Sequence, residues 1–115
     1  MELVTIQDGA VVSVAVKGRL DSVGADVLKA RVSQLIASGS TRVVIDFGEV
    51  AYISSAGFRV LLVAARLAEQ ANGALALSGI NGEVKRLFNV ASLSDMFTIL
   101  PDRAQAVEAL ANRDR

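Results

Sequence analysis

The alternation of short β-branched runs with longer segments of helical spacing constrains the fold of this chain most strongly. Residues 41–47 (TRVVIDF) have the composition of a buried parallel strand, and residues 55–72 carry apolar side chains at helical intervals. Applied along the chain, these two patterns predict strands near residues 3–6, 12–17, 41–47, 74–79 and 96–100, and helices near residues 21–39, 55–72, 81–88 and 101–112.

This order of elements predicts the fold class. Strands that alternate with helices form sheets with parallel neighbours and right-handed crossovers. The order β-β-α-β-α-β-α-β-α therefore predicts an α/β fold with a four- to five-stranded mixed sheet and about four helices. At 115 residues the chain is long enough for one core, so residues 1–115 are expected to form one domain.

Local signals place several details within these elements. Asp8-Gly9 predicts a hairpin between the first two strands, and the alternation along residues 12–17 indicates one buried face of the second strand. Gly39 is expected to end the first helix, and Pro101 to occupy the first position of the last one. One apolar stripe of the first helix is predicted from Val27, Leu28, Val32, Leu35 and Ile36.

Charge balance and missing residue types exclude several classes of function. Twelve basic and twelve acidic residues give zero net charge, and aromatic content is 4%. Nucleic-acid binders carry basic patches and stacking aromatics, so no nucleic-acid partner is expected. The chain has no Cys and no His, which excludes Cys/His zinc sites, disulfides and Ser-His-Asp triads. We therefore expect a protein that is not an enzyme and holds no metal or cofactor.

Hydropathy and the N-terminus argue against a membrane or secreted protein. The run VLLVAA near the middle of the chain is far shorter than the about 20 apolar residues that a membrane span needs. The N-terminus begins Met1-Glu2 and lacks the basic region of a signal peptide. A cytoplasmic location without membrane contact is expected.

The adjacent serines Ser54 and Ser55 lie where the central strand gives way to the next helix. Functional sites of open α/β sheets lie at such carboxyl ends of strands. One serine is explained as a helix cap, which leaves the second without a structural role. The small Ala56 and Gly57 keep this helix start open to a partner. Phosphorylation would add about −1.5 to −2 of charge near the positive end of a helix dipole, where an anion is tolerated.

The outer face of the same helix offers two interpretations. Arg59, Val63, Arg66 and Gln70 recur at helical spacing and share one side. The helix is apolar over more of its circumference than burial against one sheet requires. It is either a well-covered core helix or a protein-binding surface that begins at Ser55.

Two aspartates also follow or end predicted strands. Asp21 is explained as the cap of the first helix, and alternatively as an acceptor that orients Ser55 or a partner's nucleotide. Asp46 is expected to accept hydrogen bonds from loop amides. The segment NGEVKR contains Gly82 but no phosphate-binding loop motif, so Lys85 and Arg86 are interpreted as a solvated helix face.

Three segments together resemble a known family. GRLDSVGADVLKARV, VVIDFGEVAYISSAGFRVLLVAAR and NGEVKRLFNVASLSDMFTIL resemble the STAS domain of bacterial anti-sigma-factor antagonists in order and spacing, over nearly the whole chain. The middle segment is the most specific, because that family carries a phosphorylatable serine in a strand–loop–helix stretch of this form. The third contains the VKRLF pattern typical of the family.

The resemblance implies partner switching. In that family the unphosphorylated antagonist binds a serine kinase that is also an anti-sigma factor. The kinase phosphorylates the antagonist, which is thereby released, and a metal-dependent phosphatase removes the phosphate from the antagonist. Ser55, two residues before Gly57, matches the acceptor, with Ser54 as the second choice. Asp21 matches an acidic position near the acceptor. Ser54 stands where many members have Asp, and Ala56 where many have Ser, which puts kinase choice and rate in question.

The resemblance and the helix pattern together predict the contact surface. The partner is expected to bind the start of the helix behind Ser55 and the neighbouring loop, through Ser22, Ala56, Phe58, Arg59, Val63 and Arg66. The protein is expected to be a monomer, a substrate and switch rather than a catalyst.

Two other functions stay open at the level of sequence. The chain is alternatively a constitutive STAS-type subunit of a larger transport or signalling complex, in which Ser55 is only a helix cap. A small nucleotide-binding or hydrolysing enzyme is the third interpretation, and the lack of His, Cys and a phosphate loop disfavours it.

Overall fold

The β-branched runs of the sequence form a five-stranded sheet. In the computed structural model, which describes residues 1–112, the strands are β1 (Glu2–Asp8), β2 (Val11–Leu20), β3 (Arg42–Ile53), β4 (Ala74–Ser78) and β5 (Thr98–Leu100). They lie in the sheet in chain order, with β1 antiparallel to β2 and all other neighbours parallel. The predicted α/β class and element order are confirmed.

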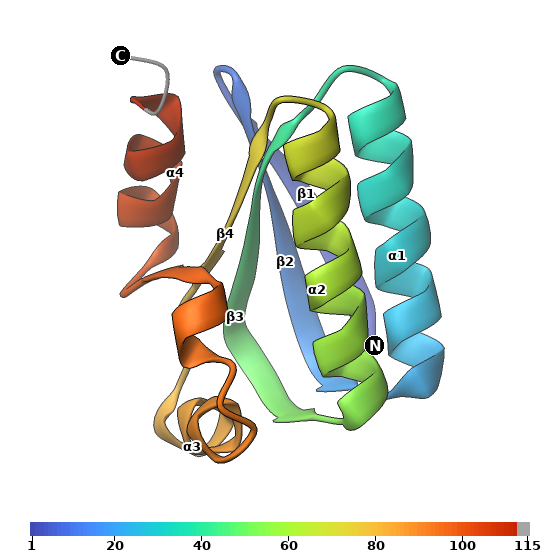
Figure 1. Cartoon of the computed structure of the whole chain (residues 1–115), viewed down its shortest axis with the longest axis vertical. Coiled ribbons are helices and arrows are strands. Elements are labelled where there is room, and N and C mark those ends of the chain that lie inside the picture. The colour runs from blue at the N-terminus through green and yellow to red at the C-terminus, as the bar shows by residue number, and fades with distance from the viewer. Residues whose placement is uncertain (113–115) are drawn as a thin grey trace.

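Helices cover the two faces of this sheet unequally. The long helices α1 (Ser22–Ala37) and α2 (Ser55–Gln70) pack side by side on one face, and α4 (Arg103–Ala111) lies on the other side (Figure 1). The shorter α3 (Gly82–Val90) and the single 3₁₀ turn η1 (Ser94–Met96) lie near the end of the sheet where α2 begins. The β2–α1–β3 and β3–α2–β4 crossovers thus place both long helices on the same face.

The larger core lies between the sheet and the helices α1, α2 and α3. Its centre is Phe88, whose ring makes edge contacts with Phe58 at 4.9 Å, Phe97 at 5.9 Å and Phe47 at 6.2 Å between centroids. Aromatic pairs in this geometry add to the hydrophobic stabilisation from burial alone. The cluster joins α2, α3, β3 and the segment before β5.

A second, smaller core lies between the sheet and α4. Ala106 and Leu110 of α4 are fully buried against apolar residues of β2, β3 and β4, which are Val11, Val44, Ala74 and Ala76. An ion pair of 2.5 Å between Arg103 and Asp8 ties α4 to the hairpin end of β1. Because α4 covers this face, β2 is buried on both sides, and Ser13 is 0% exposed instead of facing solvent as its alternation predicted.

Several details of the predicted elements differ from the structure. β3 continues past residue 47 to Ile53, because its end pairs with β2 through Lys17↔Glu49 and Leu20↔Ile53. Pro101 lies before the cap residue Asp102 and is not the first residue of α4. Val27 is 48% exposed, because α1 turns Leu28 and Val32 toward the core instead. Gly39, by contrast, follows the end of α1 with a positive φ of 98°, as expected of a helix-ending glycine.

Candidate functional site

The ends of β2 and β3 bring the two predicted site loops together. Leu20 pairs with Ile53 at the last position of the two strands, and the Ser54 amide donates to the Leu20 carbonyl at 3.0 Å. α1 therefore begins beside α2, and Asp21 and Ser54, the residues that follow the strands, lie at the same edge of the sheet. This is the edge at which α/β sheets place functional groups.

The two serines have different structural roles. The Ser54 side chain is half-buried, and its Oγ accepts a hydrogen bond of 3.2 Å from the Gly57 amide, so Ser54 is the N-cap of α2. Ser55 is the first residue of the helix and is exposed, and its hydroxyl makes no hydrogen bond with any of residues 1–112. The cap function belongs to Ser54 and leaves the Ser55 hydroxyl free.

Gly57 fixes how closely this helix start approaches the sheet. A Cβ atom at this position would lie 2.7 Å from the Leu20 carbonyl oxygen and 2.8 Å from Cγ1 of Ile53. Both distances are shorter than real Cβ contacts, so any side chain would push α2 away from β2. The absence of a side chain at Gly57 thus sets the position of Ser54 and Ser55 relative to β2.

Asp21 is the N-cap of α1, as its position in the sequence predicted. Its Oδ1 accepts a hydrogen bond of 3.0 Å from the Gly24 amide. This bond lowers the pKa of the Asp21 carboxyl below its ordinary value, and the nearby charge of Arg19 acts in the same direction. No hydrogen bond joins Asp21 to Ser55 among the described residues, so the carboxylate acts here as a cap and a fixed negative charge.

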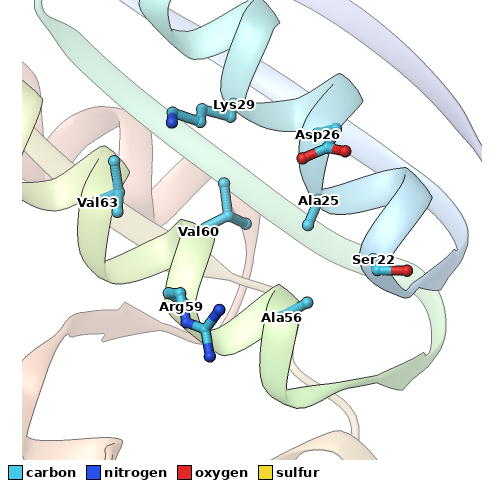
Figure 2. A pocket seen from close by; sticks show the side chains of 8 residues that line it. All are labelled: Ser22, Ala25, Asp26, Lys29, Ala56, Arg59, Val60 and Val63. Atoms are coloured by element: carbon cyan, nitrogen blue, oxygen red, sulfur yellow. The ribbon is translucent and has the colours of Figure 1, made fainter.

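A groove of about 290 Å³ runs between α1 and α2 beside these caps. Figure 2 shows its lining from both helices. The lining residues are Ser22, Ala25, Asp26 and Lys29 of α1 with Ala56, Arg59, Val60 and Val63 of α2. Small and apolar side chains thus form much of the groove, and charged groups of both signs flank them.

The structure brings together four of the six residues predicted to contact a partner. Ser22, Ala56, Arg59 and Val63 all line the groove. Phe58 instead packs against Phe88 on the side of α2 that faces α3, and the exposed Arg66 lies further along the helix, outside the groove lining. Four of the predicted contact residues thus form one groove, and Phe58 and Arg66 lie outside it.

Other exposed groups at this edge were not predicted from the sequence. Val23 in the first turn of α1 is 73% exposed, and Arg19 lies over the ring of Tyr52 at 4.4 Å from its centroid. The cross-strand pair Arg19↔Tyr52 becomes recognisable only once the register of β2 and β3 is known. Val23 could have been found from the sequence, since it lies in the first helical turn after the cap residue Asp21 and outside the helical spacing of Leu28 and Val32.

Asp46 lies on the same strand as this site but has a different partner from the one predicted. Its Oδ1 accepts a hydrogen bond of 2.9 Å from the hydroxyl of the buried Ser78, across the β3–β4 pair. The prediction of bonds to loop amides is wrong, because β3 continues beyond Asp46 and keeps it within the sheet. Asn81 provides a further link, since it caps α3 and donates to the Val50 carbonyl at 3.0 Å.

The part of the chain that the structure describes has neither a metal-binding cluster nor a membrane-spanning helix. No group of three or more His, Cys, Asp or Glu side chains within residues 1–112 could hold a metal ion. Within the same range, no helix combines the length and the apolar character needed to cross a membrane.

The fold and the paired caps match a known family. The family model described as "Mlab, STAS domain" matches residues 4–101. The chain belongs to the STAS domain family. This STAS domain is 32% identical over 102 residues to BtrV of Bordetella bronchiseptica, a protein named as an anti-sigma factor antagonist, and the match covers 89% of this chain and 87% of BtrV.

Solved structures share the architecture of this STAS domain. A Thermotoga maritima protein assigned as an anti-sigma factor antagonist matches with a TM-score of 0.88 at 19% identity, over 96% of this chain and 95% of that one. Unphosphorylated SpoIIAA, an anti-sigma factor antagonist of Bacillus, matches with a TM-score of 0.75 at 17% identity, over 96% and 99% of the two chains. The chain therefore has the STAS fold of anti-sigma factor antagonists.

Proposed function

We propose that this STAS domain is an anti-sigma factor antagonist that binds a serine kinase acting as anti-sigma factor, and that phosphorylation of Ser55 ends this binding. The observation that carries the proposal is the difference between the two serines. Ser54 uses its hydroxyl to cap α2, whereas Ser55 is exposed with an unbonded hydroxyl. Of these two serines, only Ser55 can accept a phosphate without losing a hydrogen bond of the fold.

The position of Ser55 tolerates the added charge. A phosphoserine carries about −1.5 to −2 charges at neutral pH, and the amino end of a helix is the positive end of its dipole. Ser55 is the first residue of the sixteen-residue helix α2. Phosphorylation should therefore change the surface of the domain while leaving its fold intact.

The same charge would weaken a partner interface. The groove beside Ser55 is lined by small and apolar residues such as Ala56, Val60 and Val63, which a partner can cover. Covering a phosphate in such an interface without pairing it costs several kcal/mol of desolvation. Because about 1.4 kcal/mol corresponds to a tenfold change in affinity, this suffices for a loss of more than a hundredfold.

In this mechanism the domain is a substrate and a switch. The kinase supplies ATP and the catalytic groups, and a metal-dependent phosphatase would remove the phosphate to restore binding. Ser54 as a neutral neighbour of the acceptor distinguishes this chain from family members with Asp at that position. We expect this difference to act on recognition by the kinase, since Ser54 and Asp are both good N-caps.

Phosphopeptide mapping of protein purified from its native cells tests the site. Trypsin frees residues 43–59 as VVIDFGEVAYISSAGFR, which contains both serines and no others, and fragmentation distinguishes Ser54 from Ser55. Phosphate on Ser55 is the expected result. Phosphate on Ser54 alone would contradict the assignment of the acceptor.

Binding variants test the switch. The Ser55→Ala variant is first used to isolate the serine kinase from its native cells. The affinity of this kinase for Ser55→Ala should then equal its affinity for the unphosphorylated wild type, and its affinity for Ser55→Asp should be at least about a hundredfold weaker. Equal binding of both variants, together with unmodified serines under all growth conditions, would instead favour a constitutive subunit of a larger complex. In that function Ser55 serves only as the first residue of α2.

A further inference from the structure

Arg59 stands one helical turn after the proposed phosphate acceptor. Residues four apart on a helix are neighbours on the same face, with about 5–6 Å between their Cβ atoms. Arg59 is exposed, and it forms no ion pair with any residue in the range 1–112. The start of α2 therefore holds a free guanidinium within reach of the Ser55 hydroxyl.

The direction of the Arg59 side chain favours contact with Ser55. Side chains on a helix lean toward its amino end, so a long side chain covers the turn that precedes its own Cα. Figure 2 shows the Arg59 guanidinium turned away from Asp26 and Lys29 of α1, on the open side of the groove. No contact with α1 has to be broken before the guanidinium can reach a group on Ser55.

We infer that Arg59 is the internal counter-ion of a phosphate on Ser55, and that phosphorylation thereby draws its guanidinium from the rim of the α1–α2 groove. This inference rests on the proposed phosphorylation of Ser55. A guanidinium and a phosphate can form two parallel charge-assisted hydrogen bonds, a geometry that a lysine ammonium cannot reproduce. The pair would form within one helix and would need no rearrangement of the fold.

This pairing would alter the groove in two ways at once. Before phosphorylation the charged side chains of the lining are Asp26, Lys29 and Arg59, which sum to one positive charge. Phosphorylation adds an anion at one end and occupies the only cation that α2 contributes to the lining. A partner whose acidic side chain binds Arg59 would lose this contact, and the same side chain would be repelled by the phosphate. Release of the partner would therefore not depend on repulsion alone.

The titration of phosphoserine measures this contact directly. Phosphoserine is placed at position 55 of the full chain by genetic encoding, and its second ionisation is followed by ³¹P NMR. A nearby cation favours the dianion, so Arg59→Gln should raise the second pKa, ordinarily about 6, by about 0.3–0.6 pH units relative to the wild type. The other charged groups near Ser55, Asp21, Arg19, Asp26 and Lys29, are the same in both proteins.

Two further variants supply the controls. Arg66→Gln removes the same charge from the same helix, but at a position about 16 Å from Ser55 along the helix axis, and should leave the phosphate pKa unchanged. The phosphate pKa of Arg59→Lys should lie between the values of the wild type and Arg59→Gln, because the charge remains and the bidentate geometry is lost. In 1 M NaCl the difference between wild type and Arg59→Gln should shrink, since screening acts over about 3 Å.

The outcomes separate this inference from the proposed function. Equal phosphate pKa values in Arg59→Gln and Arg66→Gln would overturn the role of Arg59, even if cells phosphorylate Ser55. Conversely, a raised pKa only in Arg59→Gln would support the contact, because the encoded phosphate is present whether or not a kinase recognises the protein.

Discussion

The helices α1 and α2 begin with similar four-residue arrangements, D-S-V-G and S-S-A-G, that use different capping chemistry. In each, the first side chain accepts a hydrogen bond from the glycine amide three residues on, at 3.0 Å for Asp21 and 3.2 Å for Ser54. In each, the second residue is an exposed serine, Ser22 or Ser55. One cap is thus charged and the other neutral within otherwise similar helix starts.

The surroundings of the two glycines also differ. Gly57 faces the Leu20 carbonyl and the Ile53 side chain, whereas the atom nearest to a Cβ at Gly24 would be the sulfur of the flexible Met1 side chain. The start of α2 therefore packs against backbone and core atoms, whereas the start of α1 packs against the flexible Met1 side chain and, at 3.1 Å, the Arg19 carbonyl oxygen. Rigid placement and a neutral cap thus coincide at the helix that carries Ser55, and because the first turn of this helix has no acidic residue, a phosphate on Ser55 would introduce its first negative charge.

The largest expected effect is that of filling the space at Gly57. Gly57→Ala should lower the free energy of unfolding by about 2–3 kcal/mol, because its Cβ meets immobile atoms. Gly24→Ala should cost about 1 kcal/mol or less, because the Met1 side chain can move aside, the Arg19 carbonyl oxygen at 3.1 Å has to give by only a few tenths of an ångström, and alanine is the better helix former. Urea denaturation measures both, and equal losses would contradict the difference in rigidity.

Removing the neutral cap should have an intermediate effect. Ser54→Ala leaves the Gly57 amide without its acceptor and should cost about 1 kcal/mol, or about 4 °C in Tm. Ser54→Asp supplies another acceptor and should retain the wild-type stability. Thermal unfolding followed by circular dichroism gives both values. A wild-type Tm for Ser54→Ala would show that the cap contributes nothing to stability.

The charged cap should differ from the neutral one in its dependence on pH. The pKa of Asp21 is lowered in the folded state, so the stability gained from its charge is present above the unfolded pKa of about 3.9 and is lost as pH falls through the folded pKa. The advantage of wild type over Asp21→Asn should therefore shrink between about pH 5 and pH 2. The loss from Ser54→Ala should stay constant over this range. Urea midpoints at several pH values test this contrast.

The smallest effect is expected at the exposed serines. Ser55→Ala and Ser22→Ala should each change the free energy of unfolding by less than about 0.5 kcal/mol, because neither hydroxyl makes a hydrogen bond with residues 1–112. Urea denaturation of the unphosphorylated proteins checks this. A loss of more than about 1 kcal/mol for Ser55→Ala alone would mean that its hydroxyl supports the fold.

The helix starts could be predicted from sequence because capping is a local property. Asp21 has the side chain of an N-cap and acts as one. At the serine pair, local preference identified one cap but could not choose between two identical side chains. The choice of Ser54 follows from the backbone bond between its amide and Leu20, which depends on the register of β2 and β3.

Features that depend on contacts between distant segments were harder to predict. The second half of β3 does not alternate regularly, because the β2–β3 pairing shifts between Ala15 and Lys17 and again between Gly18 and Arg19. The burial of Ser13 requires α4, which lies at the other end of the chain. Phe58 is predicted from the sequence to contact a partner, whereas its packing against Phe88 of α3 depends on a contact between distant segments.

The place of α4 has a consequence for how the protein emerges during synthesis. Because the strands lie in the sheet in chain order, each can pair with its predecessor as it leaves the ribosome. The face containing Val11, Val44 and Ala76 is covered only when Ala106 and Leu110 have been made. A variant truncated after Pro101 would keep all five strands but leave this apolar face bare, so α4 protects the sheet from association with neighbouring molecules.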